Sequence, residues 1–396
     1  MKKVLSTLIV LLMIPVCVQA QTIEPFEWYP DGTYNASIPT PWDFLGYQIG
    51  DDYTWHHDLL AYMEAVAAAS DRVTIGSYGQ TYEGRDLILM TISSPGNLAR
   101  AEEIRGNMAA LADPRGAQNS QLQSIIENSP AVAWLTYNVH GSESAGTEAA
   151  ILTVYQLAAG TDQVTRNILD ELVVIIAPLH NPDGRDRVVA SHKKRSGSNP
   201  DASPEAWEHG SDWPGGRSNH FMFDLNRDWG WQTQIETQSI ISHMLQWNPV
   251  VHVDFHEMGG DSYFFFPAAT PVHDAIPDVV MKWQQYYGEG NAAAFDRFGW
   301  PYYTKVGFDM YYPGFGDSWP SMMGAIGMTY EQGGGAAGSP SSWNRETGQS
   351  TPSGNEPTGT SPRRSPPCGR PRRSGRRDSG ISSPSSDMPS AWVRRR

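Results

Sequence analysis

A histidine and a glutamate three residues apart, His140 and Glu143, follow the apolar segment AVAWLTYNV and lie among small residues. This His-x-x-Glu spacing occurs once in the chain, although chance alone would give about half a match in a sequence of this composition. The context is more specific than the spacing. A strand end, a turn of small residues and then a helix let both side chains converge on one point. Imidazole nitrogen and carboxylate oxygen are both ligands that zinc accepts.

A second histidine completes a plausible ligand set. His256 ends the apolar segment PVVHVDFH, so it also stands at the end of an expected strand. Two histidines and one glutamate form a zinc site that keeps a fourth position open for water, as in catalytic sites. The two cysteines, Cys17 and Cys368, lie near the two ends of the chain. The sequence therefore predicts one zinc ion per chain, held by His140, Glu143 and His256.

The elements that would position these residues alternate between strands and helices. Strands are expected within 72–93, where two flank the turn TYEGR, and at 131–139, 172–179, 249–256 and 324–331. Helices are expected at 54–69, up to about 128, and at 144–160, 163–171, 235–247 and 274–299. A long polar loop is expected from 180 to 222. This order predicts an α/β fold with a mixed, mostly parallel twisted sheet flanked by helices on both faces, and a ligand site beyond the carboxyl ends of the strands.

The chain divides into four regions by composition. Residues 1–20 have two lysines, an apolar run and small residues at 18 and 20, a pattern typical of a cleaved signal peptide. We expect residues 21–50 to form an N-terminal lead-in segment and residues 51–339 to form the domain that carries the zinc site. Residues 340–396 are rich in Arg, Pro and Ser without a periodic apolar face, which favours a disordered or frameshifted tail. We therefore expect a secreted or periplasmic protein.

Charge and hydropathy exclude two classes of partner. The formal net charge of -14 argues against nucleic acid. Beyond the expected signal peptide, no run approaches the ~18 apolar residues of a membrane span. The sequence predicts no nucleic-acid partner, no membrane span and a monomer.

Six short motifs in order give a more specific indication. They are TYEGRDL, HGSE, NPDG at 181–184, FDLNRDW, DFHEMG and MTYEQGG. In this order they resemble the zinc carboxypeptidase family, also called metallocarboxypeptidases or funnelins, and most closely its secreted bacterial branch. The resemblance extends from Trp55 to Glu331 and implies a zinc-dependent hydrolase, a protease that removes C-terminal residues.

The resemblance also implies roles for single residues. It assigns His140, Glu143 and His256 to zinc, and Asp224 to the second ring nitrogen of His140. Peptide substrates with a free C-terminal carboxylate would be bound by Asn226 and Arg227, whose planar fork matches a carboxylate. The general base would be Glu331, and a mobile tyrosine over the substrate would be Tyr312, with adjacent Tyr311 as the alternative.

Two family positions depart from the pattern. Ser142 stands where many animal members have an arginine that helps to hold extended substrates. The arginine expected after NPDG to stabilise the oxyanion has two competing candidates, Lys193 and Arg195, and we favour Arg195. Asp317, in the loop before Glu331, would favour a basic C-terminal residue if it lined the substrate pocket, and is otherwise an ordinary loop residue.

The leading interpretation is an exported zinc metallocarboxypeptidase in which Glu331 activates a zinc-bound water to hydrolyse the C-terminal peptide bond. Two alternatives remain open. One is a peptidase of the same family that acts on cell-wall peptides with γ-D-glutamyl linkages. The other is a non-catalytic module that binds carboxylates, which the presence of Glu331 disfavours because such binding needs no general base.

Overall fold

The computed structural model describes residues 32–197, 206–259, 263–334, 343–344 and 349–350. The expected signal peptide and most of the tail lie outside these ranges. Within the tail, β11 (Trp343–Asn344) and β12 (Gln349–Ser350) form a short antiparallel pair.

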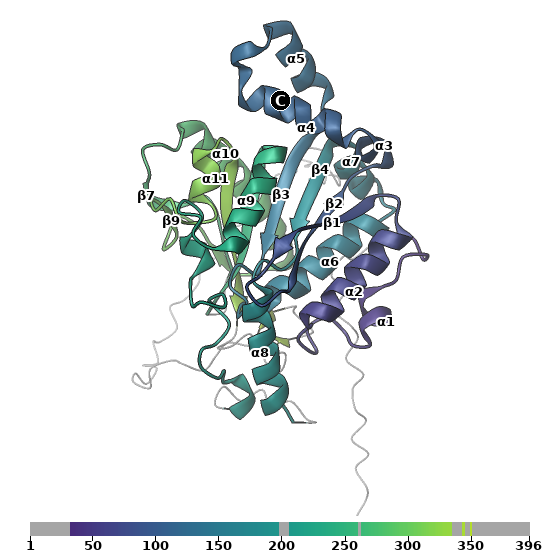
Figure 1. The fold of residues 1–396 in the computed structure, drawn as a ribbon, viewed down its shortest axis with the longest axis vertical. Coiled ribbons are helices and arrows are strands. Elements are labelled where there is room, and N and C mark those ends of the chain that lie inside the picture. Colours follow the sequence, from purple (N-terminus) through teal and green to yellow (C-terminus); the bar gives the residue numbers. More distant parts are fainter. Residues whose placement is uncertain (1–31, 198–205, 260–262, 335–342, 345–348, 351–396) are drawn as a thin grey trace, which may run out of the picture.

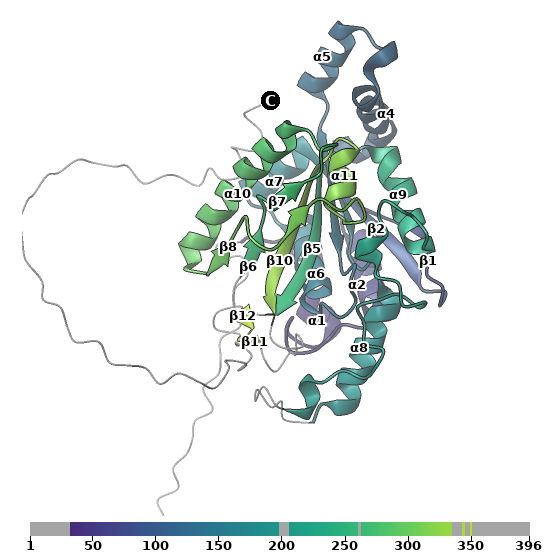
Figure 2. The same ribbon diagram turned by 90° about the vertical axis from the view of Figure 1, so that its left-hand side faces the viewer.

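An eight-stranded sheet organises the molecule, with the strand order β1-β2-β4-β3-β5-β10-β6-β8. Figure 1 labels β1 to β4 of this sheet, and Figure 2 labels β5, β10, β6 and β8. The four central strands β4, β3, β5 and β10 run parallel to one another. The pairs β1–β2, β2–β4 and β10–β6 are antiparallel, and the edge strand β8 pairs in parallel with β6. The strand bounds are β1 Val73–Gln80, β2 Asp86–Ile92, β3 Ala131–Tyr137, β4 Leu172–Ala177, β5 Val251–Gly259, β6 Tyr263–Phe265, β8 Tyr302–Tyr303 and β10 Ile326–Gly334. The expected mixed, mostly parallel sheet is confirmed.

Helices cover both faces of this sheet. In Figure 2, α10 (Asp278–Phe298) and α9 (Ile235–Trp247) lie on opposite sides of it. The core below α9 and α4 (Ala101–Ala112) buries Trp134 and Ile240. On the other face, one cluster packs under α2 (His56–Ala69) and α6 (Ala145–Ala159) and another under α10. The remaining elements are α1 Pro41–Leu45, α3 Pro95–Ala99, η1 Pro114–Gly116, α5 Asn119–Asn128, α7 Gln163–Glu171, α8 Pro182–Arg195, η2 Trp207–His209, η3 Leu225–Arg227, α11 Ser318–Met322, and the parallel pair β7 Ala269–Val272 and β9 Asp309–Met310.

The expected loop from 180 to 222 contains a helix of 14 residues. The segment from 180 begins with α8, whose start is fixed by Asn181: its side-chain oxygen accepts a hydrogen bond from the backbone of Gly184, and Pro182 occupies the first turn. Basic residues occupy its last turn, where they complement the helix dipole. The helix has no apolar stripe, because its buried residues include Asp183 and Arg185 as well as valines. That is why hydrophobic periodicity did not predict it.

The parallel strands bring their carboxyl ends to one edge of the sheet. The connections from β3 to α6 and from β4 to α8 both leave this edge, and β5 and β10 end there side by side. Ligands of such sheets bind beyond this edge. Among the described helices, none is both long and apolar enough to cross a bilayer.

Candidate metal centre and catalytic residues

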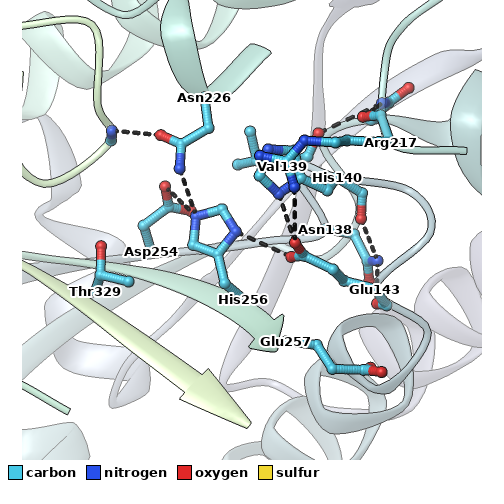
Figure 3. A network of polar contacts seen from close by, with 12 residues as sticks. Asn138, Val139, His140, Glu143, Arg217, Asn226, Asp254, His256, Glu257 and Thr329 are labelled. Atoms are coloured by element: carbon cyan, nitrogen blue, oxygen red, sulfur yellow. Dashed lines mark hydrogen bonds and ion pairs between the residues drawn. The ribbon is translucent and has the colours of Figure 1, made fainter. Parts of the chain in front are cut away.

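Three side chains meet beyond the ends of β3 and β5. His140, Glu143 and His256 each offer one ligand atom, and these atoms lie within 4.8 Å of one another. The Nδ1 atom of His140 is 2.5 Å from Oε1 of Glu143, and the Nδ1 atom of His256 is 2.9 Å from Oε2 of the same carboxylate (Figure 3). Because β5 pairs in parallel with β3, residues far apart in the sequence arrive at one point.

The turn that carries His140 and Glu143 is built by Asn138. This residue has a positive φ of 51°, which asparagine tolerates better than most residues. Its buried side-chain amide donates to the backbone carbonyls of His140 and Glu143, and its oxygen accepts from the hydroxyl of Thr147. The amide therefore closes the turn and holds both ligand-bearing residues against the start of α6.

Each histidine has a carboxylate on its other ring nitrogen. The Nε2 atom of His140 is 2.8 Å from Asp224, and the Nε2 atom of His256 is 2.9 Å from Asp254. With a metal bound at Nδ1, a carboxylate beside Nε2 would keep the ring proton on Nε2, because an ionised carboxylate only accepts hydrogen bonds. At His256 the side-chain amide nitrogen of Asn226 also lies 3.1 Å from Nε2. The donor set of two Nδ1 atoms and one carboxylate fits zinc with an open position.

The charges in this cluster shift the pKa values of His140 and Glu143. Burial alone would lower the pKa of His140, but the charge of Glu143 and the bond to Asp224 outweigh it and raise that pKa. Burial would likewise raise the pKa of Glu143, but His140 and His256 lower it to about 2. The carboxylate is thus ionised at neutral pH, and a metal would replace the proton that the imidazoles share with it.

Glu331 lies on the strand next to this cluster. It is the register partner of His256 across the β5–β10 ladder, and it is only 8% exposed. Its Oε2 atom has no hydrogen-bond partner within the described ranges. Burial, the largest effect, raises the pKa of Glu331 to about 7. A carboxyl group with a pKa near the working pH is well suited to general acid–base chemistry.

The residues expected to bind a carboxylate follow Asp224 on η3. Asp224 caps this short helix by accepting from the backbone of Asn226, so one side chain orients both His140 and η3. The Asn226 oxygen accepts from the backbone of Gly316 at 2.8 Å, while the exposed guanidinium of Arg227 lies 4.7 Å from the ring centre of Phe315. One guanidinium nitrogen, NH1, donates to the backbone carbonyl of Asn226 at 2.7 Å. The guanidinium has five N–H donors, so others on this exposed side chain are available to an anion near the cluster.

Of the two adjacent tyrosines, Tyr312 is the one beside Arg227. Its hydroxyl donates to the Arg227 carbonyl at 3.2 Å and accepts from the indole of Trp231 at 2.6 Å. The Tyr311 ring instead lies 5.7 Å from that of His273. The geometry favours Tyr312 over Tyr311.

Comparisons with known proteins agree with this site. The family model described as zinc carboxypeptidase matches residues 59–270, which include both histidines and Glu143. The chain belongs to the zinc carboxypeptidase family. A curated zinc carboxypeptidase from Saccharothrix mutabilis subsp. capreolus is 25% identical over 217 residues, which is 51% of this chain and 40% of that protein's length. This chain thus aligns with well under half of that relative.

Solved structures share the fold. The carboxypeptidase A from Helicoverpa armigera has a TM-score of 0.52 at 16% identity, covering 76% of this chain and 71% of its own. Thrombin activatable fibrinolysis inhibitor has a TM-score of 0.50 at 13% identity, and the match covers 75% of this chain and 70% of that one. The fold of this zinc carboxypeptidase family member is therefore confirmed. Glu331 lies beyond the residues that the family model matches.

The structure does not bring the expected oxyanion residue to the cluster. Arg195 ends α8, and a helix rising 1.5 Å per residue carries it about 20 Å from Pro182 at the site edge. Its guanidinium binds Asp212 at 2.5 Å and lies 4.1 Å from the ring centre of Trp207. The competing Lys193 is paired with Asp52. Both side chains therefore have partners elsewhere.

Arg217 is the arginine that contacts the cluster. Its Nε atom donates to Asp224 at 3.0 Å, and its NH1 atom lies 3.8 Å from Glu143 (Figure 3). The sequence did not identify it, because the family resemblance placed this arginine in the segment directly after NPDG, which was expected to be a loop. A signal existed: Arg217 stands only seven residues before Asp224, which was already expected at His140.

Asp317 does not line an open pocket. It is 3% exposed and accepts hydrogen bonds from the hydroxyls of Ser318 and Thr329. Burial raises its pKa to about 6. Its role in this geometry is to hold α11 against β10, so it gives no support to a preference for basic residues.

Proposed function

We propose that this protein is an exported zinc-dependent carboxypeptidase that hydrolyses the C-terminal peptide bond of peptides. The single observation that carries the proposal is the position of Glu331, a buried carboxyl group with a pKa of about 7 directly beside the His140–Glu143–His256 cluster. A module that only bound carboxylates would need Arg227 but no such base. Export rests on the signal-like sequence of residues 1–20, and a monomer stays our expectation.

The proposed mechanism divides the work among named residues. Asn226 and Arg227 bind the terminal carboxylate of the substrate, which places the last peptide bond at the cluster. Zinc held by His140, Glu143 and His256 would supply Lewis acidity to the scissile carbonyl and the attacking water. Glu331 accepts a proton from that water and delivers it to the leaving amine.

Two further side chains complete the site in this proposal. Arg217, next to Glu143, replaces Arg195 as the cation that stabilises negative charge developing on the carbonyl oxygen. Tyr312 covers the substrate from the side of Arg227. Trp231 holds the tyrosine hydroxyl in position through its indole N–H.

The test is peptide digestion followed by mass spectrometry. Zinc-loaded protein is incubated with a peptide mixture in which each sequence has a free and an amidated C-terminus, and Glu331→Gln is the matched control. We expect loss of single C-terminal residues from the free acids only, abolished by a chelator and lost in the variant. Cleavage at internal bonds of the peptides would exclude the proposed carboxypeptidase activity. Zinc-bound protein that leaves all peptides intact but cleaves γ-D-glutamyl peptides would favour the cell-wall alternative.

A further inference from the structure

A rigid turn beside the metal cluster displays three consecutive apolar side chains to solvent. Phe221, Met222 and Phe223 are 56%, 44% and 49% exposed and come immediately before Asp224. We call these three residues the apolar turn. Single exposed apolar residues are ordinary, but contiguous ones at the rim of a site mark a surface that contacts something.

The apolar turn is built by a buried residue. Asn219 is 0% exposed, and its side-chain oxygen accepts from the backbone N–H groups of Phe221 and Phe223 at 3.1 and 3.0 Å. Its amide nitrogen donates to Gln234 and Glu236 at the start of α9. The turn is thus anchored to the body of the protein, and its conformation is fixed.

The backbone of the apolar turn is strained at Met222. Met222 has a φ of +65°, a left-handed value that glycine adopts without a steric penalty and that other L-residues rarely adopt. Such strain concentrates at sites that bind or react. A methionine at this position places an exposed apolar side chain where a glycine would stabilise the fold better.

The surroundings of the apolar turn define its place relative to a substrate. The ring of Phe221 packs edge-on against that of Tyr82, with 4.6 Å between the ring centres, and Nδ1 of His220 lies 3.0 Å from Oε1 of Glu83. Tyr82 and Glu83 both belong to the β1–β2 connection. Arg227, on the other side of Asp224, faces Phe315. The apolar turn thus lies by the β1–β2 connection, whereas Arg227 lies by the connection that leads through α11 to β10. In the strand order, β3 and β5, whose ends carry the cluster, stand between β2 and β10.

We propose that the apolar turn binds apolar side chains on the amino-terminal side of the scissile bond. This inference rests on the proposed function: a peptide whose terminal carboxylate is held by Arg227 and whose last bond lies at the cluster continues toward the apolar turn. The substrate class is therefore peptides with hydrophobic residues in the positions before the one removed. Arg217 contacts both Glu143 and Asp224, the residue that follows the apolar turn, so it offers the backbone of such a peptide a polar neighbour.

The test compares two hexapeptides with the same C-terminal residue, one with leucine and one with serine at the two preceding positions. The full chain is expected to prefer the leucine peptide about ten-fold in kcat/KM, the selectivity that one apolar pocket provides. The triple variant Phe221→Ser/Met222→Gly/Phe223→Ser keeps the backbone conformation accessible and should bring the ratio close to one. The matched control is Phe298→Ser/Val306→Ser, which removes exposed apolar side chains elsewhere and should keep the wild-type ratio.

Binding to the zinc-loaded Glu331→Gln protein separates this inference from the proposed function. If the leucine peptide binds tighter and the triple variant abolishes the difference, the apolar turn is a peptide subsite even if the wild type hydrolyses neither peptide. An unchanged preference in the triple variant overturns the inference. So does loss of binding to phosphatidylglycerol vesicles with an unchanged peptide preference, which would assign the apolar turn to a lipid surface.

Discussion

At the scale of single residues, Asp254 is the side chain whose charge most directly supports His256. Its carboxylate is 0% exposed and contacts Nε2 of His256, with no hydrogen-bond partner elsewhere in the described chain. Asp224, the corresponding partner of His140, also binds Arg217, which offsets its charge. Both therefore orient a ligand, but only the charge of Asp254 is left uncompensated by an arginine.

We expect Asp254→Asn to weaken zinc binding by about 10–100-fold, the usual effect of losing such a partner. The asparagine keeps the shape but removes the charge that holds the proton on Nε2. Competition with a chromophoric chelator measures the affinity without relying on activity. Asp224→Asn is the matched variant and should have the smaller effect. Wild-type affinity in Asp254→Asn would mean that the aspartate only fills space.

The ionisation of Glu331 predicts a pH profile. Because burial raises its pKa to about 7, the carboxylate needed to accept a proton is lost as the pH falls below that value. We expect kcat/KM to drop about ten-fold per pH unit on the acidic side. Glu331→Gln should give a low, flat profile between pH 5 and 8. A wild-type profile that is equally flat would remove Glu331 from the role of base.

Substitution of Arg217 and of Arg195 by alanine is expected to have opposite effects on turnover. Arg217→Ala should lower kcat by about 100-fold or more, as loss of a group that stabilises an oxyanion does, while zinc content stays full. Arg195→Ala removes a side chain bound to Asp212 and Trp207 and should turn over peptides at close to the wild-type rate. Steady-state kinetics of both variants decides between them. The reverse result would restore Arg195 as the oxyanion residue.

At the scale of elements, the sequence predicted what hydrophobic pattern and local turns determine. Helices α7 and α9 have the expected bounds, and β3, β4, β5 and β10 follow from their buried apolar runs. It did not predict α8, a helix in which half of the buried residues are polar or charged, nor the contact of Arg217 with the cluster. The latter depends on the path of a long connection, which is fixed by tertiary contacts such as those of Asn219 rather than by local propensity.

The β3–α6 turn and the start of α8 fit together closely, which makes Gly141 a testable position. A Cβ atom there would lie 2.2 Å from the backbone nitrogen of Arg185 and 2.4 Å from the carbonyl carbon of Gly184. Since both are backbone atoms, the two elements would have to separate. Gly141→Ala should cost about 1–3 kcal/mol and lower zinc affinity as His140 and Glu143 shift.

Gly106 in α4 is the matched control for this substitution. A Cβ atom there meets nothing within 4 Å, so Gly106→Ala should stabilise the helix by about 0.5–1 kcal/mol without affecting zinc. Urea unfolding and chelator competition measure the two quantities on both variants. Equal behaviour of the two would show that the close fit at Gly141 is unimportant.

At the scale of the whole molecule, the site depends on segments from most of the described chain. The metal cluster lies at the ends of β3 and β5, the proposed base Glu331 lies on β10, and the residues proposed to bind the substrate carboxylate lie on η3 between α8 and α9. The family model matches residues 59–270, yet Glu331 reaches the cluster only because β10 pairs with β5. The integrity of the sheet is therefore a condition for catalysis as well as for folding.

Arg185 is a buried charge on α8 that contacts α6 and the segment before α2. It is 0% exposed and donates to Glu148 on α6 at 2.6 Å, and to the backbone carbonyls of Ser144 and Thr54. Arg185→Met should lower the free energy of unfolding in urea by about 3–5 kcal/mol, because Glu148 is left buried without its cation. The double variant Arg185→Met/Glu148→Leu removes both charges and should lose less stability than the single variant. If the two substitutions were simply additive, the pair would not be coupled, and the loss would come from the two backbone hydrogen bonds instead.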